Sequence, residues 1–271
     1  MREFANICIE NAALSEGATR PEMLSLPGAR LGVMRALSQD GEVFTVELTE
    51  ALFDNESLKK ELIRELSRIF RLFLKKYNVG KRDLILVLGV GNEGMTADAL
   101  GAKTLKYLDI TEQYHSAGVG DRGKGRLAAI AGGVSGVTGI ASFDVAKGVV
   151  ERVNPKLVFA VDTLASRRAP RLQRAVQITD TGLVPGSGVN NSKEIFSINT
   201  LGVPVIAVGV PLVIYAKNIL SAYAAEGAHI DLKRAEKDLG ELVVTVKEID
   251  VSVDDFAKVI ASGLNHAIHK S

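Results

Sequence analysis

Two periodicities alternate along the chain, and together they predict an α/β fold. From Glu42 to Glu50 an apolar residue stands at every second position, which is the period of a half-buried strand. From Ser57 to Tyr77 apolar residues recur every three or four positions and Lys and Arg fill the gaps, as in an amphipathic helix. We expect residues 30–36 to pair with the first strand as a hairpin through the turn Gln39-Asp40-Gly41.

Further along, the strands read as continuous apolar runs, which are typical of parallel strands covered on both faces. Such runs predict strands at 84–88, 156–161 and 203–208, and amphipathic patterns predict helices from about Thr96, at 143–153 and at 253–268. Strands that alternate with helices favour a single α/β domain over residues 1–271, with a mainly parallel sheet flanked by helices. Within it we expect an N-terminal hairpin region at 1–50 and a polar connection at 222–240.

The longest apolar run extends from Leu201 to Ala216 and contains two prolines and two glycines. It is shorter than the roughly 20 residues that a membrane-spanning helix needs. We therefore predict a buried strand that leads into a helix, and no membrane association.

The charge balance and the cysteine count argue against some classes of protein. The 33 Lys and Arg residues balance 32 Asp and Glu residues, which argues against nucleic-acid binding through bulk positive charge. Cys8 is the single cysteine, so an internal disulfide is excluded and a reducing compartment is expected. The mixed polarity of the N-terminus does not fit a signal peptide, and we expect a cytoplasmic protein.

A glycine turn, Gly89-Val-Gly91-Asn-Glu-Gly94, follows a predicted strand and precedes a predicted helix. It fits the pattern of a dinucleotide-binding turn, which also requires an acidic residue at the end of the next strand. Asp109 is the candidate for this acidic residue, but the segment around it has only a weak strand pattern. The alternative is a tight strand-to-helix turn in which glycines adopt positive φ.

Two aspartates are candidates for chemistry. Asp162 comes at or just after the end of the buried strand 157–161, and Asp98 comes just after another strand. Carboxyl ends of parallel strands form the ligand-binding edge of an open α/β sheet, and a buried carboxylate is costly without a function. Asp98, or Thr96 beside it, also fits a plain helix N-cap.

The remaining polar signals are weaker. The loop TDTGLVPGSGVNN contains Asp180, Gly186, Ser187 and Gly188, and its backbone N–H groups suit an anion or oxyanion as well as they suit an ordinary ordered loop. The four histidines lack metal-ligand spacing, so we expect no metal and no cofactor. Neither a serine-hydrolase elbow nor a P-loop is found in the sequence.

Four ordered segments resemble the germination protease (spore protease) family. They are GNEGMTADALGAK, GVSGVTGIASFDVAKGVVERVNPKLVFAVDTLASR, QITDTGLVPGSG and TLGVPVIAVGVP. The resemblance covers most of the chain from about Gly89. It implies that the glycine turn is part of an active site.

The resemblance implies an endopeptidase that degrades small acid-soluble spore proteins during germination, in the cytoplasm of the forespore or spore core. It implies a fold similar to that of hydrogenase maturation peptidases, a homotetramer, and a catalytic aspartate pair that matches Asp98 and Asp162. Two adjacent carboxylates share one proton and titrate as a unit. As substrate or oxyanion contacts we expect Asn92, Asp180 and the Gly186–Gly188 loop.

The chain also departs from the family pattern. Asn6, in FANICIE, stands where the family has Asp, and Glu93 replaces a frequent Trp. The departure at Asn6 argues against a zymogen step. The altered glycine turn keeps a second function open, namely a catalytically silent binding or structural protein of the spore. A dinucleotide-dependent enzyme is the third hypothesis.

Overall fold

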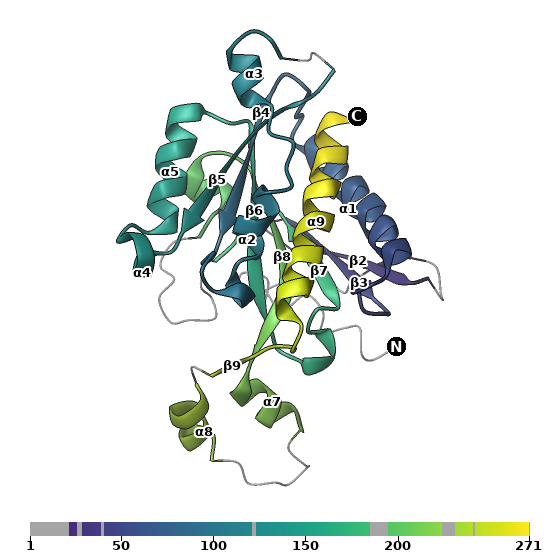
Figure 1. The fold of residues 1–271 in the computed structure, drawn as a ribbon, viewed down its shortest axis with the longest axis vertical. Helices are drawn as coiled ribbons and strands as arrows, with labels where there is room; N and C mark the ends of the chain where they lie inside the picture. Colours follow the sequence, from purple (N-terminus) through teal and green to yellow (C-terminus); the bar gives the residue numbers. More distant parts are fainter. Residues whose placement is uncertain are drawn as a thin grey trace.

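The computed structural model describes residues 22–25, 29–38, 41–120, 123–184, 195–223, 231–240 and 242–270. Within these ranges the centre of the molecule is a nine-stranded mixed sheet with helices on both faces (Figure 1). Eight of its strands follow the order β1-β2-β3-β7-β8-β6-β4-β5, and β9 pairs with β8. Asn6, Cys8 and the Gly186–Gly188 loop lie outside the described residues.

One half of the sheet is antiparallel and the other half is parallel. The antiparallel half contains β1 (Glu22–Met23), β2 (Leu31–Leu37), β3 (Glu42–Leu48) and β7 (Ala175–Thr179). The parallel half contains β8 (Val205–Tyr215), β6 (Leu157–Ser166), β4 (Leu84–Val90) and β5 (Arg126–Gly133). Strand β7 joins the halves by pairing antiparallel with β8, and β9 (Val243–Val244) pairs antiparallel with the end of β8.

Each face of the parallel half packs on different helices, because side chains alternate along a strand. Phe159 of β6 belongs to the larger core with α1 (Glu56–Lys76) and α9 (Ile249–His269), and its ring meets that of Phe70 edge to face. Its neighbour Ala160 belongs to the second core with α5 (Ser142–Val153). The parallel strands are therefore covered on both sides, as their continuous apolar runs predict.

Shorter helices connect these elements. They are η3 (Thr96–Asp98), α2 (Leu100–Leu105), α3 (Glu112–Ser116), α4 (Ser135–Thr138), η4 (Ala169–Arg171), α6 (Ile198–Leu201), α7 (Ala216–Tyr223) and α8 (Leu232–Leu239). No helix in the described part of the chain is both long and apolar enough to cross a membrane.

The α/β architecture, the β2–β3 hairpin and the strand β8 that leads into α7 confirm the sequence predictions. Two details were wrong. Strand β6 continues to Ser166 instead of ending near Val161, so Asp162 lies inside a strand. The helix expected from Thr96 is a 3₁₀ turn followed by the six-residue α2. The segment around Asp109, whose strand pattern is weak, forms no strand.

Candidate active site

Asp162 occupies a step in the sheet where pairing with one neighbouring strand stops and pairing with the other continues. Strand β4 pairs with β6 up to the Gly89–Val161 pair, and β8 continues past it and pairs Gly209 with Asp162. Asp162 is thus held in strand geometry by β8 on one side and lies one residue beyond the last β4–β6 pair on the other. Only 5% of its surface is exposed. This step explains why an aspartate in the middle of a long strand is still available to the loop that follows β4.

That loop presents Asp98. The chain leaves β4 at Gly91, whose φ of +99° favours glycine. The backbone N–H of Asn92 then donates to Asp98 Oδ2 at 2.7 Å, and the side chain of Asn92 accepts the N–H of Gly94 at 2.9 Å. The carboxylate of Asp98 therefore closes the glycine turn upon itself. Neither η3 nor α2 has a side-chain N-cap, so the helix-cap interpretation of Thr96 and Asp98 was wrong.

Helix α2 holds the turn close to the sheet because its second residue is glycine. A β carbon at Gly101 would lie 2.3 Å from the carbonyl oxygen of Val90 and 2.5 Å from that of Val161. No other residue fits between the two strands at this depth. Sequence analysis did not identify Gly101, although a glycine inside a helical pattern is a signal of close packing.

Electrostatics shows that Asp98 and Asp162 lie close enough to affect each other. Burial raises the pKa of Asp162 well above its usual range, and the negative charge of Asp98 raises it further. Against these effects, the N–H of Thr163 donates to Asp162 Oδ1 at 2.8 Å, which favours the carboxylate. Burial also raises the pKa of Asp98, and the bond from Asn92 N–H opposes that rise. Each carboxylate accepts one backbone hydrogen bond and neither is paired with a cation in the described structure.

Thr163 contributes its backbone N–H to the site, and it also carries a buried hydroxyl that the sequence did not single out. This hydroxyl oxygen has no hydrogen-bond partner among the described residues, and because side chains alternate along β6 it lies on the face of the sheet opposite to the side chain of Asp162. A buried, unsatisfied hydroxyl is uncommon and calls for an explanation such as a bound water or ligand.

Of the other predicted contacts that the structure describes, one lies at this pair and one does not. Asn92 does, through its bond to Asp98. Asp180 does not, because β7 runs antiparallel to β8 and its last residue, Thr179, pairs with Ala207 toward the amino end of β8. The role expected for the Gly186–Gly188 loop concerns residues outside the described structure.

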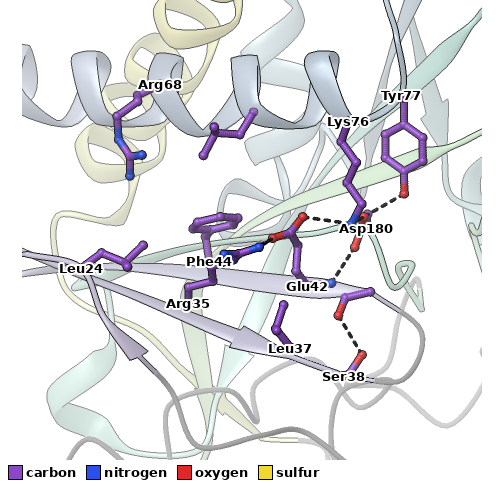
Figure 2. A pocket seen from close by; sticks show the side chains of 12 residues that line it. Leu24, Arg35, Leu37, Ser38, Glu42, Phe44, Arg68, Lys76, Tyr77 and Asp180 are labelled. Atoms are coloured by element: carbon purple, nitrogen blue, oxygen red, sulfur yellow. Dashed lines mark hydrogen bonds and ion pairs between the residues drawn. The ribbon is translucent and has the colours of Figure 1, made fainter.

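Asp180 instead sits in a cluster of charged and polar groups between α1 and the β2–β3 hairpin (Figure 2). Its carboxylate accepts hydrogen bonds from Lys76 Nζ at 2.6 Å, from Tyr77 Oη at 2.8 Å and from the backbone N–H of Glu42 at 2.8 Å. Burial and the Asp180 carboxylate raise the pKa of Tyr77, which stays a neutral hydrogen-bond donor. The cluster lines a cavity of about 790 Å³. These contacts suit a structural role, joining the hairpin, β7 and α1.

The structure does not meet the second requirement of a dinucleotide site, an acidic residue at the end of the next strand. Asp109 lies in a loop that receives His269 at the end of α9, not at the end of a strand. Gly89 serves close packing, because a β carbon there would be 2.7 Å from the backbone of Gly101. Among the described residues no group of three His, Cys, Asp or Glu side chains is placed to hold a metal ion. The arrangement left for chemistry is the pair of interacting aspartates.

Comparison with known proteins identifies the family of the chain. A family model described as germination protease matches residues 29–225. Curated proteins called germination protease match most of the chain, among them those of Halalkalibacterium halodurans (33% identity, covering 89% of this chain and 80% of the relative) and Bacillus subtilis (32%, 86% and 79%). The germination protease of Clostridium acetobutylicum matches at 33% identity, over 88% of this chain and 81% of its own length.

Proposed function

This chain belongs to the germination protease family, and from that premise we propose that it is an endopeptidase that hydrolyses small acid-soluble spore proteins with the Asp98–Asp162 pair. The family supports a peptidase of spore germination. The substrate and the aspartate mechanism are our proposal, and the observation that carries them is the electrostatic coupling of two partly desolvated carboxylates.

The proposed reaction needs one proton on the pair. Two carboxylates this close do not both ionise easily, so one holds a proton while the other is charged. Burial raises the pKa of both carboxyls, and the charge of Asp98 raises that of Asp162 further, so the pair retains a shared proton. Each carboxyl accepts one backbone N–H, Asp98 from Asn92 and Asp162 from Thr163, which stabilises the ionised form at either position.

In this scheme the ionised carboxylate takes a proton from a water molecule while the oxygen of that water attacks the scissile carbonyl carbon. The protonated carboxyl donates its proton to the carbonyl oxygen as the tetrahedral intermediate forms. Collapse of the intermediate breaks the C–N bond, and the amine leaves with the proton taken from water. One hydroxyl of the intermediate returns its proton to the carboxylate that had donated it, as the C=O of the product acid forms. The pair returns to one shared proton, so the atoms and charges balance over the cycle.

The direct test is to incubate the purified protein with a small acid-soluble spore protein and to analyse the products by mass spectrometry. Discrete fragments from the wild type, and none from Asp162→Asn, are expected. If the wild type and the variant cleave equally, the aspartate mechanism is wrong. If neither cleaves, the catalytically silent spore protein becomes the better description.

We further propose that the protein works as a homo-oligomer, a tetramer by family resemblance, in the cytoplasm of the forespore or spore core. Analytical ultracentrifugation of the full chain tests the first point. A fluorescent fusion followed through sporulation tests the second.

A further inference from the structure

Strand β5 is the last strand of the sheet on the side nearest the aspartate pair. It pairs parallel with β4, and the described residues place no strand on its other side (Figure 1). Edge strands present backbone N–H and C=O groups on which another chain can pair. In soluble proteins such edges are commonly blocked by charged residues, proline or a covering loop.

The first half of this edge is covered and the second half is not. The N–H of Leu127 donates to Thr111 Oγ1 at 2.9 Å, and its C=O accepts the backbone N–H of Thr111 at 3.0 Å. Leu127 therefore directs its backbone groups away from β4. Because these groups alternate along a strand, Ala129 and Ala131 direct theirs to the same outer side. No hydrogen bond to that side is found for either residue in the described structure.

The residues of this edge carry none of the usual protection. From Leu127 to Phe143 the sequence contains no charged residue and no proline. Ala131 is exposed, and the turn that follows β5 exposes Val137 (73%) and Ile140 (53%). The exposed half of β5 thus leads into an uncharged, partly aliphatic turn.

Along the strand direction, this edge is level with the proposed site. Ala131 pairs with Gly89, and Gly89 pairs with Val161, the residue before Asp162. Neighbouring strands are roughly 4.8 Å apart, so this row spans about 10 Å from Ala131 to Val161. A few residues of extended chain cover that distance, at roughly 3.3 Å each.

We propose that the outer edge of β5, at Ala129 and Ala131, binds an extended and uncharged segment of the protein substrate as an added strand. The bound segment leads its scissile bond over the end of β4 to Asp98 and Asp162. Its backbone supplies the acceptors and donors that match the free N–H and C=O groups, and Val137 and Ile140 meet its apolar side chains. This inference rests on the proposed peptidase function and specifies how the substrate binds.

The short length of the edge favours a substrate over a second copy of this chain. Thr111 covers Leu127, and Gly133 with φ of +64° ends the regular strand, which leaves two residues for pairing. A stable subunit interface buries about 1,200–2,000 Å². Two residues of strand supply far less than that, and weak, reversible pairing suits a peptide that must leave after cleavage.

The first test measures amide exchange at single residues by NMR, using the Asp162→Asn protein with and without a small acid-soluble spore protein. We expect the substrate to slow exchange at Ala129 and Ala131 by about tenfold or more, and to leave Ala128 and Ile130, which bond β4, unchanged. Binding without protection at Ala129 and Ala131, or no binding, overturns the inference. So does protection that grows with protein concentration in the absence of substrate, because it indicates a second copy.

The second test removes one outward donor by Ala131→Pro, a change that an edge strand tolerates when the N–H faces solvent. We expect kcat/KM for the spore protein to fall about tenfold, the scale of one lost hydrogen bond. Glu56→Pro, at the first position of α1 where proline fits, is the matched control and is expected to keep kcat/KM. Equal kcat/KM in Ala131→Pro and wild type, with circular dichroism showing both folded, overturns the inference.

The two tests separate failure of the inference from failure of the proposed function. If the wild type cleaves nothing, the proposed function fails, and the exchange experiment still decides whether β5 binds the spore protein. If cleavage depends on Asp162 but the exchange at β5 does not respond to substrate, the peptidase stands and the edge proposal fails.

Discussion

The backbone of Gly101 in α2 lies directly against that of Gly89 in β4. A β carbon on Gly89 would be 2.7 Å from the carbonyl carbon and oxygen of Gly101, a separation that real side chains do not adopt. Because η3 immediately precedes α2, this glycine contact sets the height of Asp98 above the sheet. The same contact places α2 over Val161, beside Asp162. The close contact of two glycines thus positions the two aspartates.

Gly101→Ala is expected to separate the aspartates and to lower both activity and stability. The added methyl group would meet backbone atoms of Val90 and Val161, which cannot move without shifting the strands. Overpacking of this kind costs about 1–3 kcal/mol of unfolding free energy. Urea unfolding and kcat for spore-protein cleavage measure the two effects.

Gly148→Ala is the matched control. Gly148 lies in α5, and a β carbon there would meet nothing within 4 Å. Alanine inside a helix is more stable than glycine by roughly 0.5–1 kcal/mol, so this variant is expected to be slightly more stable and fully active. Equal effects of the two substitutions would contradict the positioning role of Gly101.

Asp98→Asn and Asp162→Asn are each expected to lower kcat by about 10²–10⁴-fold, the usual contribution of a general acid or base. An amide cannot exchange the proton that the pair shares, so the loss should be similar for both variants and the double variant should lose little more. Single-turnover cleavage measures the chemical step. A variant with wild-type kcat would remove that residue from the mechanism.

Asp162→Asn is also expected to stabilise the protein at neutral pH. The folded-state pKa of Asp162 is raised, so wild-type stability is highest when the group is protonated and falls as pH rises from the unfolded-state pKa of about 3.9 through the folded one. Asparagine is uncharged at every pH. We expect a gain on the order of 1–3 kcal/mol at pH 7, which shrinks toward pH 4.

Urea unfolding of the two proteins across this pH range checks the sign. A stability difference that does not change with pH would show that the effect comes from the amide group and not from the charge. A wild type that becomes more stable, relative to the variant, as pH rises would contradict the raised pKa of Asp162.

Asp180→Ala is expected to destabilise the fold by about 3 kcal/mol. It would leave the N–H of Glu42 and the hydroxyl of Tyr77 without their acceptor and would remove the buried partner of Lys76. The exposed ion pair Arg234–Asp238 supplies the control, since Asp238→Ala is expected to change stability by less than about 1 kcal/mol.

Activity distinguishes the structural role of Asp180 from the substrate contact expected from the sequence. With folding restored by low temperature or a stabilising osmolyte, the Asp180→Ala protein is expected to cleave with a KM close to that of the wild type. A large rise in KM without a loss of stability would favour a substrate contact.

The secondary structure followed from the sequence wherever burial produced a clear period. The alternation in β3 and the apolar runs of β4, β6 and β8 are direct consequences of one or two covered faces. The ends of the strands were predicted less accurately than their positions. The end of β6 was placed too early because its last residues, from Asp162 to Ser166, are no longer a continuous apolar run although β8 still pairs with them.

By itself the sequence determined the family, the α/β class and the two candidate aspartates, since these depend on local pattern and on ordered motifs. Only the tertiary structure decided which polar residues share a site. Asp98 and Asp162 are 64 positions apart, and they interact because the pairing of β4 with β6 ends one residue before Asp162 and the chain then turns at Gly91. Asp180 is nearer to Asp162 in sequence but is carried away by the antiparallel course of β7. The antiparallel pairing of β7 with β3 and β8 joins segments that are far apart in the sequence, so the local pattern around Asp180 did not reveal it.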